Sequence, residues 1–225
     1  MRIIELFWAW ITSPAQWSGA DGIPARLGEH LFYTGLALLI ALAIALPLGL
    51  LAGHTGKGTF LIVNSANAVR ALPTLGVLGL VVVLRGIGLL PVMVALVALA
   101  IPAILVNTYA GVRAADPAVV DAARGMGMRS SEVLRLVELP LAWPLILLGI
   151  RTAVIQIIAT ATVAAYVGLG GLGRYIFDGL ARRDYEAVVG GSVLVVALAL
   201  LTEAAYALLR RRNPASPSKA PTRTS

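Results

Sequence analysis

The sequence contains no cysteine, so disulfide bonds and thiolate metal ligands are both excluded. Its two histidines, His30 and His54, lie far apart in unlike surroundings, and we expect no metal site. Charged residues make up only 13% of the chain and aromatic residues 6%, whereas 59% are hydrophobic and the mean hydropathy is +0.88. Such a chain has too little polar surface for a water-soluble domain. The composition and its long apolar runs predict an all-α protein embedded in a lipid membrane.

The excess of basic residues does not indicate nucleic-acid binding. The net charge is +7, but the lysines and arginines are scattered through loops and a carboxyl-terminal tail without interleaved aromatic residues. No nucleophile, base and orienting group form a recognisable pattern, so we do not expect an enzyme. Because most of the 225 residues are needed to span the membrane, any energy source or soluble receptor is expected to be a separate chain.

Five apolar segments are long enough to cross a membrane, which requires about 20 mostly apolar residues. We expect these spans at residues 31–52, 59–84, 90–112, 141–167 and 188–209. The second span carries Asn64, Asn67 and Arg70 and is expected to bend at Pro73, because proline interrupts the helical hydrogen bonds.

The segments that flank these spans set the expected orientation. Residues 1–28 include an apolar run too short to span, and we expect an extracytoplasmic segment at the membrane surface, followed by a transmembrane domain over residues 29–210. Residues 211–225 are basic and proline-rich, which is typical of a disordered tail. Positively charged loops remain in the cytoplasm. Lys57, the arginine-rich segment 113–140 and the tail therefore place the carboxyl terminus inside and the amino terminus outside.

The segment 113–140 mixes charged and apolar residues between the third and fourth spans, and its first half predicts a short helix. Asp116 can cap this helix and Pro117 can occupy its first turn. The helix is expected to run to Met126, where Gly125 and Gly127 end it.

A second short helix is expected in the same segment. Ser130 or Ser131 can cap it, and it should end near Glu138, just before Pro140 and the fourth span. The first of the two helices has an apolar face without a partner in so short a loop, and we expect another protein to dock there. That face is formed by Val119, Ala122, Ala123 and Met126.

The spacing of this segment resembles the EAA motif of ATP-binding-cassette importer permeases. The matching residues are Asp121, Ala122, Ala123, Gly127, Val137, Leu139 and Pro140, with Asp and Val where the motif usually has Glu and Ile. The resemblance implies a type I importer permease fold, in which this loop is the coupling helix that docks on a separate ATPase subunit. The residues then expected to couple to the ATPase are Asp121, Ala122, Ala123, Met126, Gly127, Leu139 and Pro140. An amphipathic loop lying on the lipid headgroups is the alternative.

Four further stretches resemble the permease subunits of osmoprotectant importers for glycine betaine, choline, carnitine or proline betaine. They are EHLFYTGLALLIALAIALPLGLLAG, RALPTLGVLGL, IPAILVNTYAGV and AAYVGLGGLGRYIFDGL. The resemblance implies a bacterial cell-membrane complex of two permease subunits, identical or related, two ATPase subunits and an extracytoplasmic substrate-binding protein. It also implies that ATP and Mg²⁺ are bound by the ATPase, with no cofactor in this chain.

Two glycine-rich motifs imitate nucleotide-binding loops. The stretch GLGGLG matches the spacing GxGxxG at Gly168, Gly170 and Gly173, but it follows a full span and lacks the strand and the acidic residue that dinucleotide binding requires. We expect a tight extracellular turn there. The stretch GHTGKG lacks the spacing of a phosphate loop, because Lys57 is followed by Gly58.

Polar residues within the spans are candidates for a translocation pathway. On the fourth span, Thr152, Gln156 and Thr160 recur every four residues and so share one helix face, which must meet protein or water. The remaining candidates are Asn64, Asn67, Arg70, Asn107 and Tyr109. The alternative is that these groups only hydrogen-bond neighbouring helices together. Arg151, close to the expected inner edge, is predicted to reach the interface or the coupling segment.

Two alternative functions remain open at this stage. The same importer could carry an amino acid, a sulfonate or another small solute. A stand-alone ion-coupled carrier is the alternative of another class, but such carriers require intramembrane acidic residues and internal repeats. Glu203 is the one acidic residue well inside an expected span, and five spans do not divide into equal halves.

Overall fold

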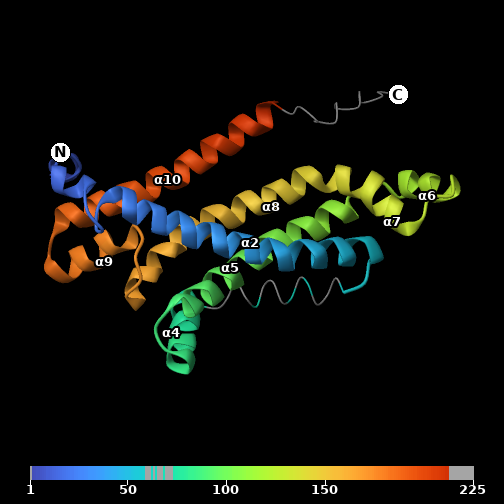
Figure 1. Ribbon diagram of the computed structural model, residues 1–225. Coiled ribbons are helices and arrows are strands. Elements are labelled where there is room, and N and C mark those ends of the chain that lie inside the picture. Colours follow the sequence, from blue (N-terminus) through green and yellow to red (C-terminus); the bar gives the residue numbers. More distant parts are fainter. Residues whose placement is uncertain (1, 59–61, 63, 65–67, 69–72, 213–225) are drawn as a thin grey trace.

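The computed structural model describes residues 2–58, 62, 64, 68 and 73–212. Within these residues all regular structure is helical (Figure 1). The elements are α1 (Arg2–Ile11), η1 (Pro14–Trp17), α2 (Ile23–Thr55), α4 (Thr74–Arg85), α5 (Leu89–Arg113), α6 (Pro117–Gly125), α7 (Ser130–Val133), η2 (Leu134–Glu138), α8 (Leu139–Thr160), η3 (Ala161–Val167), α9 (Gly173–Arg182) and α10 (Tyr185–Arg212).

Helices α2, α5 and α8 lie side by side and form the core of an elongated bundle (Figure 1). Their contact depends on small residues, because every fourth position of α2 from Ala37 to Gly53 is alanine or glycine and buried. A Cβ atom added to Gly49 would lie 2.7 Å from Cβ of Thr108 on α5. Small residues at this spacing let two backbones approach closely, which is how helices pack in membranes.

Four described helical stretches are long and apolar enough to cross a membrane: Ile23–Thr55, Leu89–Arg113, Ser130–Val167 and Tyr185–Leu208. They include the first, third, fourth and fifth expected spans. Much of the amino-terminal half of the second expected span lies outside the described residues, and its carboxyl-terminal part is α4, which begins directly after Pro73. Pro73 has an extended backbone, with φ −69° and ψ 121°, and the residues directly before it, 69–72, at which the expected bend would begin, lie outside the described part of the chain.

The amino-terminal boundary lies earlier than we expected from the sequence. Helix α2 begins at Ile23, where Gly22 caps it and a proline occupies the first turn, so residues 23–28 belong to the first long helix and not to the preceding segment. Helix α1 is amphipathic. Its Trp10 is buried and packs edge to face on Tyr175 of α9, with ring centroids 4.9 Å apart, whereas Trp8 is exposed.

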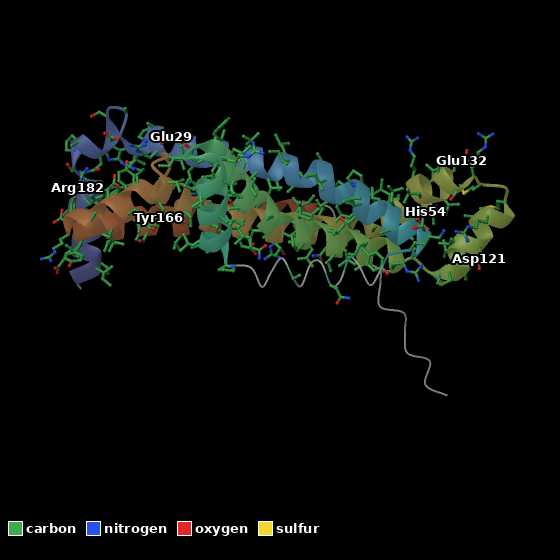
Figure 2. All side chains as sticks on the ribbon, turned by 90° about the horizontal axis from the view of Figure 1, so that it is seen from below. Glu29, His54, Asp121, Glu132, Tyr166 and Arg182 are labelled. Atoms are coloured by element: carbon green, nitrogen blue, oxygen red, sulfur yellow. The ribbon has the colours of Figure 1, made fainter. Side chains whose placement is uncertain are left out.

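The two ends of the bundle are polar (Figure 2). Glu29, Tyr166 and Arg182 lie at one end, and His54, Asp121 and Glu132 lie at the other. Helix α2 ends at the second of these ends, where α6 and α7 also lie, whereas α9 lies at the first (Figure 1).

The expected helix break at Pro140 is absent, and the chain is helical without interruption from Ser130 to Val167. A π-helical turn, η2, precedes the proline, and Leu139 donates its backbone N–H to the carbonyl of Leu134. A proline ring inside an α-helix clashes with the carbonyl group one turn before it. A π-helical turn is wider than an α-helical turn, so it leaves room for the ring. Pro140 therefore lies in the first turn of α8, and the segment after the glycine corner is a rigid extension of a long helix.

Candidate functional site: the segment 113–140 and the polar ends of the bundle

The helix predicted before the glycine corner is confirmed. Asp116 accepts a hydrogen bond at Oδ1 from the backbone N–H of Ala118 at 2.9 Å, and Pro117 occupies the first turn of α6. The helix ends at Gly125, and Gly127 has a left-handed backbone with φ +88°. Glycine is favoured there because a side chain in that conformation meets its own backbone.

The exposed face of α6 differs in one residue from the expected docking surface. The side chains of Val119 and Met126 are 46% and 76% exposed, and Ala122 and Asp121 are exposed as well. Ala123 is only 3% exposed, because it turns inward against the rest of the segment. The outward face of α6 therefore comprises Val119, Ala122 and Met126.

The distal residues of the expected coupling set lie on the long helix. Leu139 is half-buried and packs against a cluster formed by Val112, Ala142 and Ile146, whereas Pro140 is exposed. Val112 lies at the end of α5, and Ala142 and Ile146 lie in α8. The residues expected to couple to the ATPase are thus divided between the region of α6 and the start of α8.

Neither serine predicted to cap the second helix does so. The helix begins at Ser130, and Arg129 precedes it as the capping residue. The backbone N–H of Arg129 donates to Oε2 of Glu132 at 2.6 Å. An acidic side chain in the first turn thus supplies a hydrogen-bond acceptor for the backbone at the start of the helix.

His54 connects the end of the first long helix to the second half of the coupling segment. Its Nδ1 lies 2.5 Å from Oε2 of Glu138, and its Nε2 lies 2.6 Å from Oγ of Ser130. With its proton on Nδ1, a neutral imidazole donates to the carboxylate and accepts from the hydroxyl. The Glu138 side chain is only 6% exposed, so the histidine supplies the partner that a buried carboxylate requires. Sequence reasoning missed this contact because His54 and Glu138 are far apart in the chain.

We expect the variant His54→Ala to destabilise the protein by about 1–3 kcal/mol, because it leaves a buried carboxylate without its partner. Thermal unfolding of the purified chain in detergent measures this. His54→Gln, which retains a side-chain donor, should recover part of the loss, and Lys57→Ala at an exposed neighbouring position should have no effect. Equal unfolding temperatures for His54→Ala, Lys57→Ala and the unchanged protein would contradict the prediction.

Two polar candidates of the third and fourth spans, Asn107 and Thr152, form hydrogen bonds within their own helices. Asn107 donates from Nδ2 to the carbonyl of Ala103 at 2.7 Å, and Thr152 donates from Oγ1 to the carbonyl of Leu148 at 2.9 Å. Because each of these bonds stays within one helix, neither ties two helices together.

Gln156 and Thr160 differ from these two residues. The Oε1 atom of Gln156 is buried and has no hydrogen-bond partner among the described residues. Thr160 lines a small cavity of about 10 Å³ between α4, α5 and α8. Of the other candidates, Tyr109 is half-buried and Asn64 is exposed. Asn67 and Arg70 lie outside the described residues.

Arg151 does not reach the coupling segment, contrary to the expectation from the sequence. It forms an ion pair with Glu203 of α10, and its Nε donates to Oε2 at 2.7 Å. Its guanidinium also lies over the ring of Tyr206, 4.9 Å from the ring centroid. Glu203, the one acidic residue well inside the fifth expected span, is therefore the partner of Arg151. The ion pair compensates both charges within the membrane.

The glycine-rich stretch GLGGLG forms the tight turn that was expected, with φ +79° at Gly168 and +91° at Gly171. The turn encloses the carboxylate of Glu29 on α2. Gly171 donates its backbone N–H to Oε2 of Glu29 at 2.7 Å, and a Cβ atom at Gly170 would collide with the same carboxylate. A glycine is needed at position 170 because the turn approaches the carboxylate so closely.

Arg26 joins Glu29 to the preceding segment of the chain. Its guanidinium donates to Oε2 of Glu29 at 2.9 Å and also pairs with Asp21. The hydroxyl of Tyr175 donates to the backbone carbonyl of Asp21 at 2.6 Å, and burial raises the pKa of Tyr175 to about 12. The phenol therefore remains a donor at neutral pH, and this end of the bundle is held by interlocking polar contacts.

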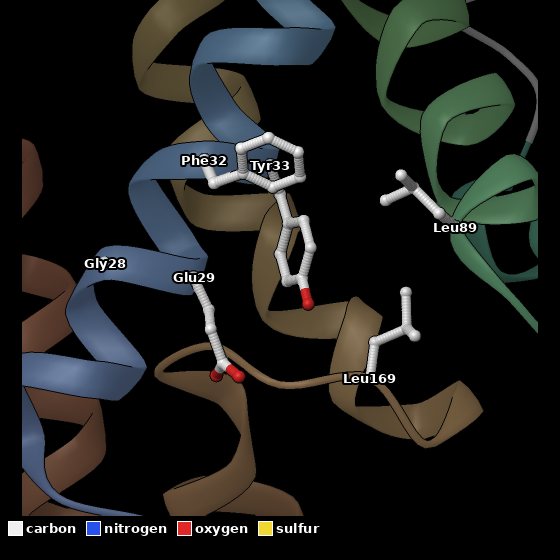
Figure 3. Close-up of a pocket in the computed structure, with 6 residues that line it drawn as sticks. All are labelled: Gly28, Glu29, Phe32, Tyr33, Leu89 and Leu169. Atoms are coloured by element: carbon white, nitrogen blue, oxygen red, sulfur yellow. The ribbon is translucent and has the colours of Figure 1, made fainter. Parts of the chain in front are cut away.

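A cavity of about 450 Å³ lies beside this polar network (Figure 3). It is lined by Gly28, Glu29, Phe32, Tyr33, Leu89 and Leu169. Figure 3 shows the Glu29 side chain extending from α2 toward the loop that carries Leu169, with the two aromatic rings on α2 and the two leucines across from them.

Comparison with known proteins shows which family the chain matches. The family model described as "Binding-protein-dependent transport system inner membrane component" matches residues 45–213. The glycine betaine/carnitine/choline transport system permease protein OpuCB of Bacillus subtilis (strain 168) is 38% identical over 187 residues, which cover 83% of this chain and 86% of the relative. The choline transport system permease protein OpuBB of the same organism is 39% identical over 184 residues, which cover 82% and 85%. The osmoprotectant import permease protein OsmW of Salmonella typhimurium (strain LT2) is 33% identical over 181 residues, which cover 78% and 84%.

Solved structures have the same arrangement of helices. An inward-facing conformation of the MetNI methionine ABC transporter aligns with a TM-score of 0.70 and 26% identity, covering 82% of this chain and 93% of the solved chain. The crystal structure of an amino acid ABC transporter with histidines aligns with a TM-score of 0.72 and 21% identity, covering 92% and 98%. At that identity the second likeness concerns the fold alone.

Proposed function

Because the chain belongs to the family of binding-protein-dependent transport system inner membrane components, we propose that it carries a quaternary-amine osmoprotectant, delivered by a separate binding protein, across the bacterial cell membrane. The proposal of a cargo rests on relatives whose names specify choline, carnitine, glycine betaine or osmoprotectants and which are 33–39% identical to the chain. Candidate solutes are glycine betaine, choline, carnitine and proline betaine.

We propose that α6 is the coupling helix on which an ATPase subunit docks, and that this partner binds ATP and Mg²⁺. The observation that supports this best is the exposed apolar face of α6 at one end of the bundle, formed by Val119, Ala122 and Met126. Behind this face, His54 and Leu139 connect the segment to the long helices. Closure of the ATPase would therefore reach α2 and α8 through rigid contacts.

The proposed topology has five spans, with residues 59–84 forming the second span between α2 and α5. It places the amino terminus outside and the carboxyl terminus, with the tail 211–225, in the cytoplasm. The support is that α2 ends beside α6 and α7, where Lys57 and the arginines of the segment 113–140 also lie. The opposite end, with α1 and α9, would face the binding protein.

The pathway is proposed to run along the face of α8 that carries Gln156 and Thr160. Oε1 of Gln156 is the buried polar atom there without a partner among the described residues, so it is available to a passing solute or to water. A second permease subunit, either a second copy or a related chain, would complete the importer.

Dependence on partner chains tests this function. We expect the purified chain alone neither to hydrolyse ATP nor to concentrate solute in proteoliposomes, because the ATPase and the receptor are separate proteins. Together with its ATPase and binding protein it should import radiolabelled choline or glycine betaine when ATP is present inside the vesicles. Accumulation by the chain alone, driven by an ion gradient, would instead establish a stand-alone carrier. Import of an amino acid or a sulfonate but no quaternary amine would overturn the proposed cargo.

A further inference from the structure

The cavity beside Glu29 combines one carboxylate with two aromatic rings and two leucines. Phe32 and Tyr33 are neighbours on α2, with ring centroids 5.9 Å apart and ring planes inclined by 65°. The Phe32 side chain is 56% exposed and Tyr33 is nearly buried, so the rings form a wall that is anchored on one side and accessible on the other. Aromatic faces attract cations, and their apolar surfaces accommodate methyl groups.

The charged network that borders the cavity contains more negative than positive side chains, because one arginine, Arg26, is shared between the two carboxylates of Asp21 and Glu29. The contacts of Glu29 engage its Oε2 atom, which accepts from Arg26 and from the backbone of Gly171. Oε1 retains its capacity to face a positive charge.

The position of the carboxylate is held rigidly. The turn from Gly168 to Gly173 encloses it, and Leu169 of the same turn lines the cavity. The turn thus contributes both the backbone donor that orients Glu29 and an apolar wall of the cavity. This accounts for the glycines that imitate a nucleotide-binding loop in the sequence. A site that is already ordered before the ligand binds requires less free energy for ordering during binding.

We propose that this cavity is a receiving site for the trimethylammonium group of a solute, in which Glu29 supplies the charge and Phe32 and Tyr33 supply the aromatic faces. The inference rests on the proposed function, since it specifies where the permease itself recognises the cargo. Leu89 and Leu169 contact the methyl groups on the side opposite the rings. The same chemistry occurs in the headgroup of phosphatidylcholine, so the test excludes choline lipids.

The experiment measures choline binding to the complete complex of permease and ATPase subunits, without binding protein, in nanodiscs of phosphatidylethanolamine and phosphatidylglycerol. Saturation-transfer NMR follows the N-methyl protons of choline. The matched probe is 3,3-dimethylbutan-1-ol, which has the shape of choline with a neutral carbon in place of the nitrogen. We expect choline to bind saturably and about tenfold more tightly than this alcohol, because the carboxylate and the rings act on the charge.

The variants separate recognition from folding. Glu29→Gln retains the hydrogen-bond acceptor but removes the charge, and Phe32→Leu retains an apolar side chain but removes the ring; each should weaken choline binding roughly fivefold to tenfold. Glu29→Asp, which retains the charge, should bind more tightly than Glu29→Gln. The controls Glu186→Gln and Tyr166→Leu alter exposed residues outside the cavity and should bind as the unchanged complex does.

Equal affinity for choline and the alcohol, or unchanged choline binding in both Glu29→Gln and Phe32→Leu, would overturn the site. If Glu29→Gln fails to assemble, Phe32→Leu decides alone, because a half-exposed side chain tolerates replacement. Uptake by the unchanged complex with its binding protein is measured in parallel. Normal uptake of choline or glycine betaine without binding in the nanodiscs would overturn this site alone, whereas absent uptake of every quaternary amine would overturn the proposed function.

Discussion

Replacement of Met126 by aspartate is expected to abolish stable association with the ATPase while leaving the permease folded. Met126 is 76% exposed on the outward face of α6, so the change removes little packing within this chain. In a docked complex it would bury an unpaired carboxylate, which costs several kcal/mol. Each 1.4 kcal/mol corresponds to a tenfold change in affinity, so the loss should exceed about 100-fold. Co-purification of the ATPase with the tagged permease measures the association.

Two control variants test whether the loss of association is specific to a charge on α6. Met126→Leu retains an apolar side chain and should associate normally, and a charge introduced in the tail by Ser216→Asp should have no effect. Ala123→Glu would be a poor probe of docking despite its place in the motif, because Ala123 is buried and the glutamate would disrupt the segment itself. Normal association and normal stimulation of ATP hydrolysis in Met126→Asp would show that α6 is not the docking helix.

The second large effect concerns the ion pair between Arg151 and Glu203. Glu203→Leu is expected to destabilise the protein by about 3 kcal/mol or more, because it leaves an arginine within the membrane without its carboxylate partner. For a chain of this size, that corresponds to a fall in the thermal midpoint of roughly 10 °C. Thermal unfolding followed by fluorescence-detected size exclusion measures the change.

The double variant Arg151→Met, Glu203→Leu should recover most of this loss, because neither charge then remains and the two side chains can pack as apolar groups. Glu186→Leu, at an exposed position on the same helix α10, should unfold like the unchanged protein. A midpoint for Glu203→Leu equal to that of the unchanged protein, or a double variant less stable than both single variants, would contradict a structural role for the pair.

Local patterns in the sequence were sufficient to predict much of the fold. The apolar runs predicted the helices that contain the first, third, fourth and fifth spans, since length and hydropathy alone decide whether a helix can cross a membrane. The pair Asp116 and Pro117 and the glycines after them predicted α6, because capping depends on residues within one turn of the helix end. The resemblance to osmoprotectant permeases is confirmed by relatives that match most of the chain.

The expectations that failed were those in which a local signal competed with packing. A proline ordinarily ends a helix, but the π-helical turn before Pro140 allows the helix to continue into α8. Residues 23–28 were placed before the first expected span, which begins at residue 31, yet they form the start of α2. Ala123 fits the apolar face of α6 by spacing, and only its neighbours in space show that it points inward.

The sequence by itself determined that the chain is helical and membrane-embedded, where its long helices lie, and that the polar segment 113–140 separates two of them. These properties depend on the composition and order of residues near one another. Tertiary structure alone decided which polar groups meet: His54 with Glu138, Arg151 with Glu203, and Glu29 with the turn at Gly171. Each pair joins residues that are distant in the sequence. Such contacts arise only when helices and loops that are far apart in the chain pack against one another, and one sequence contains no local pattern for them.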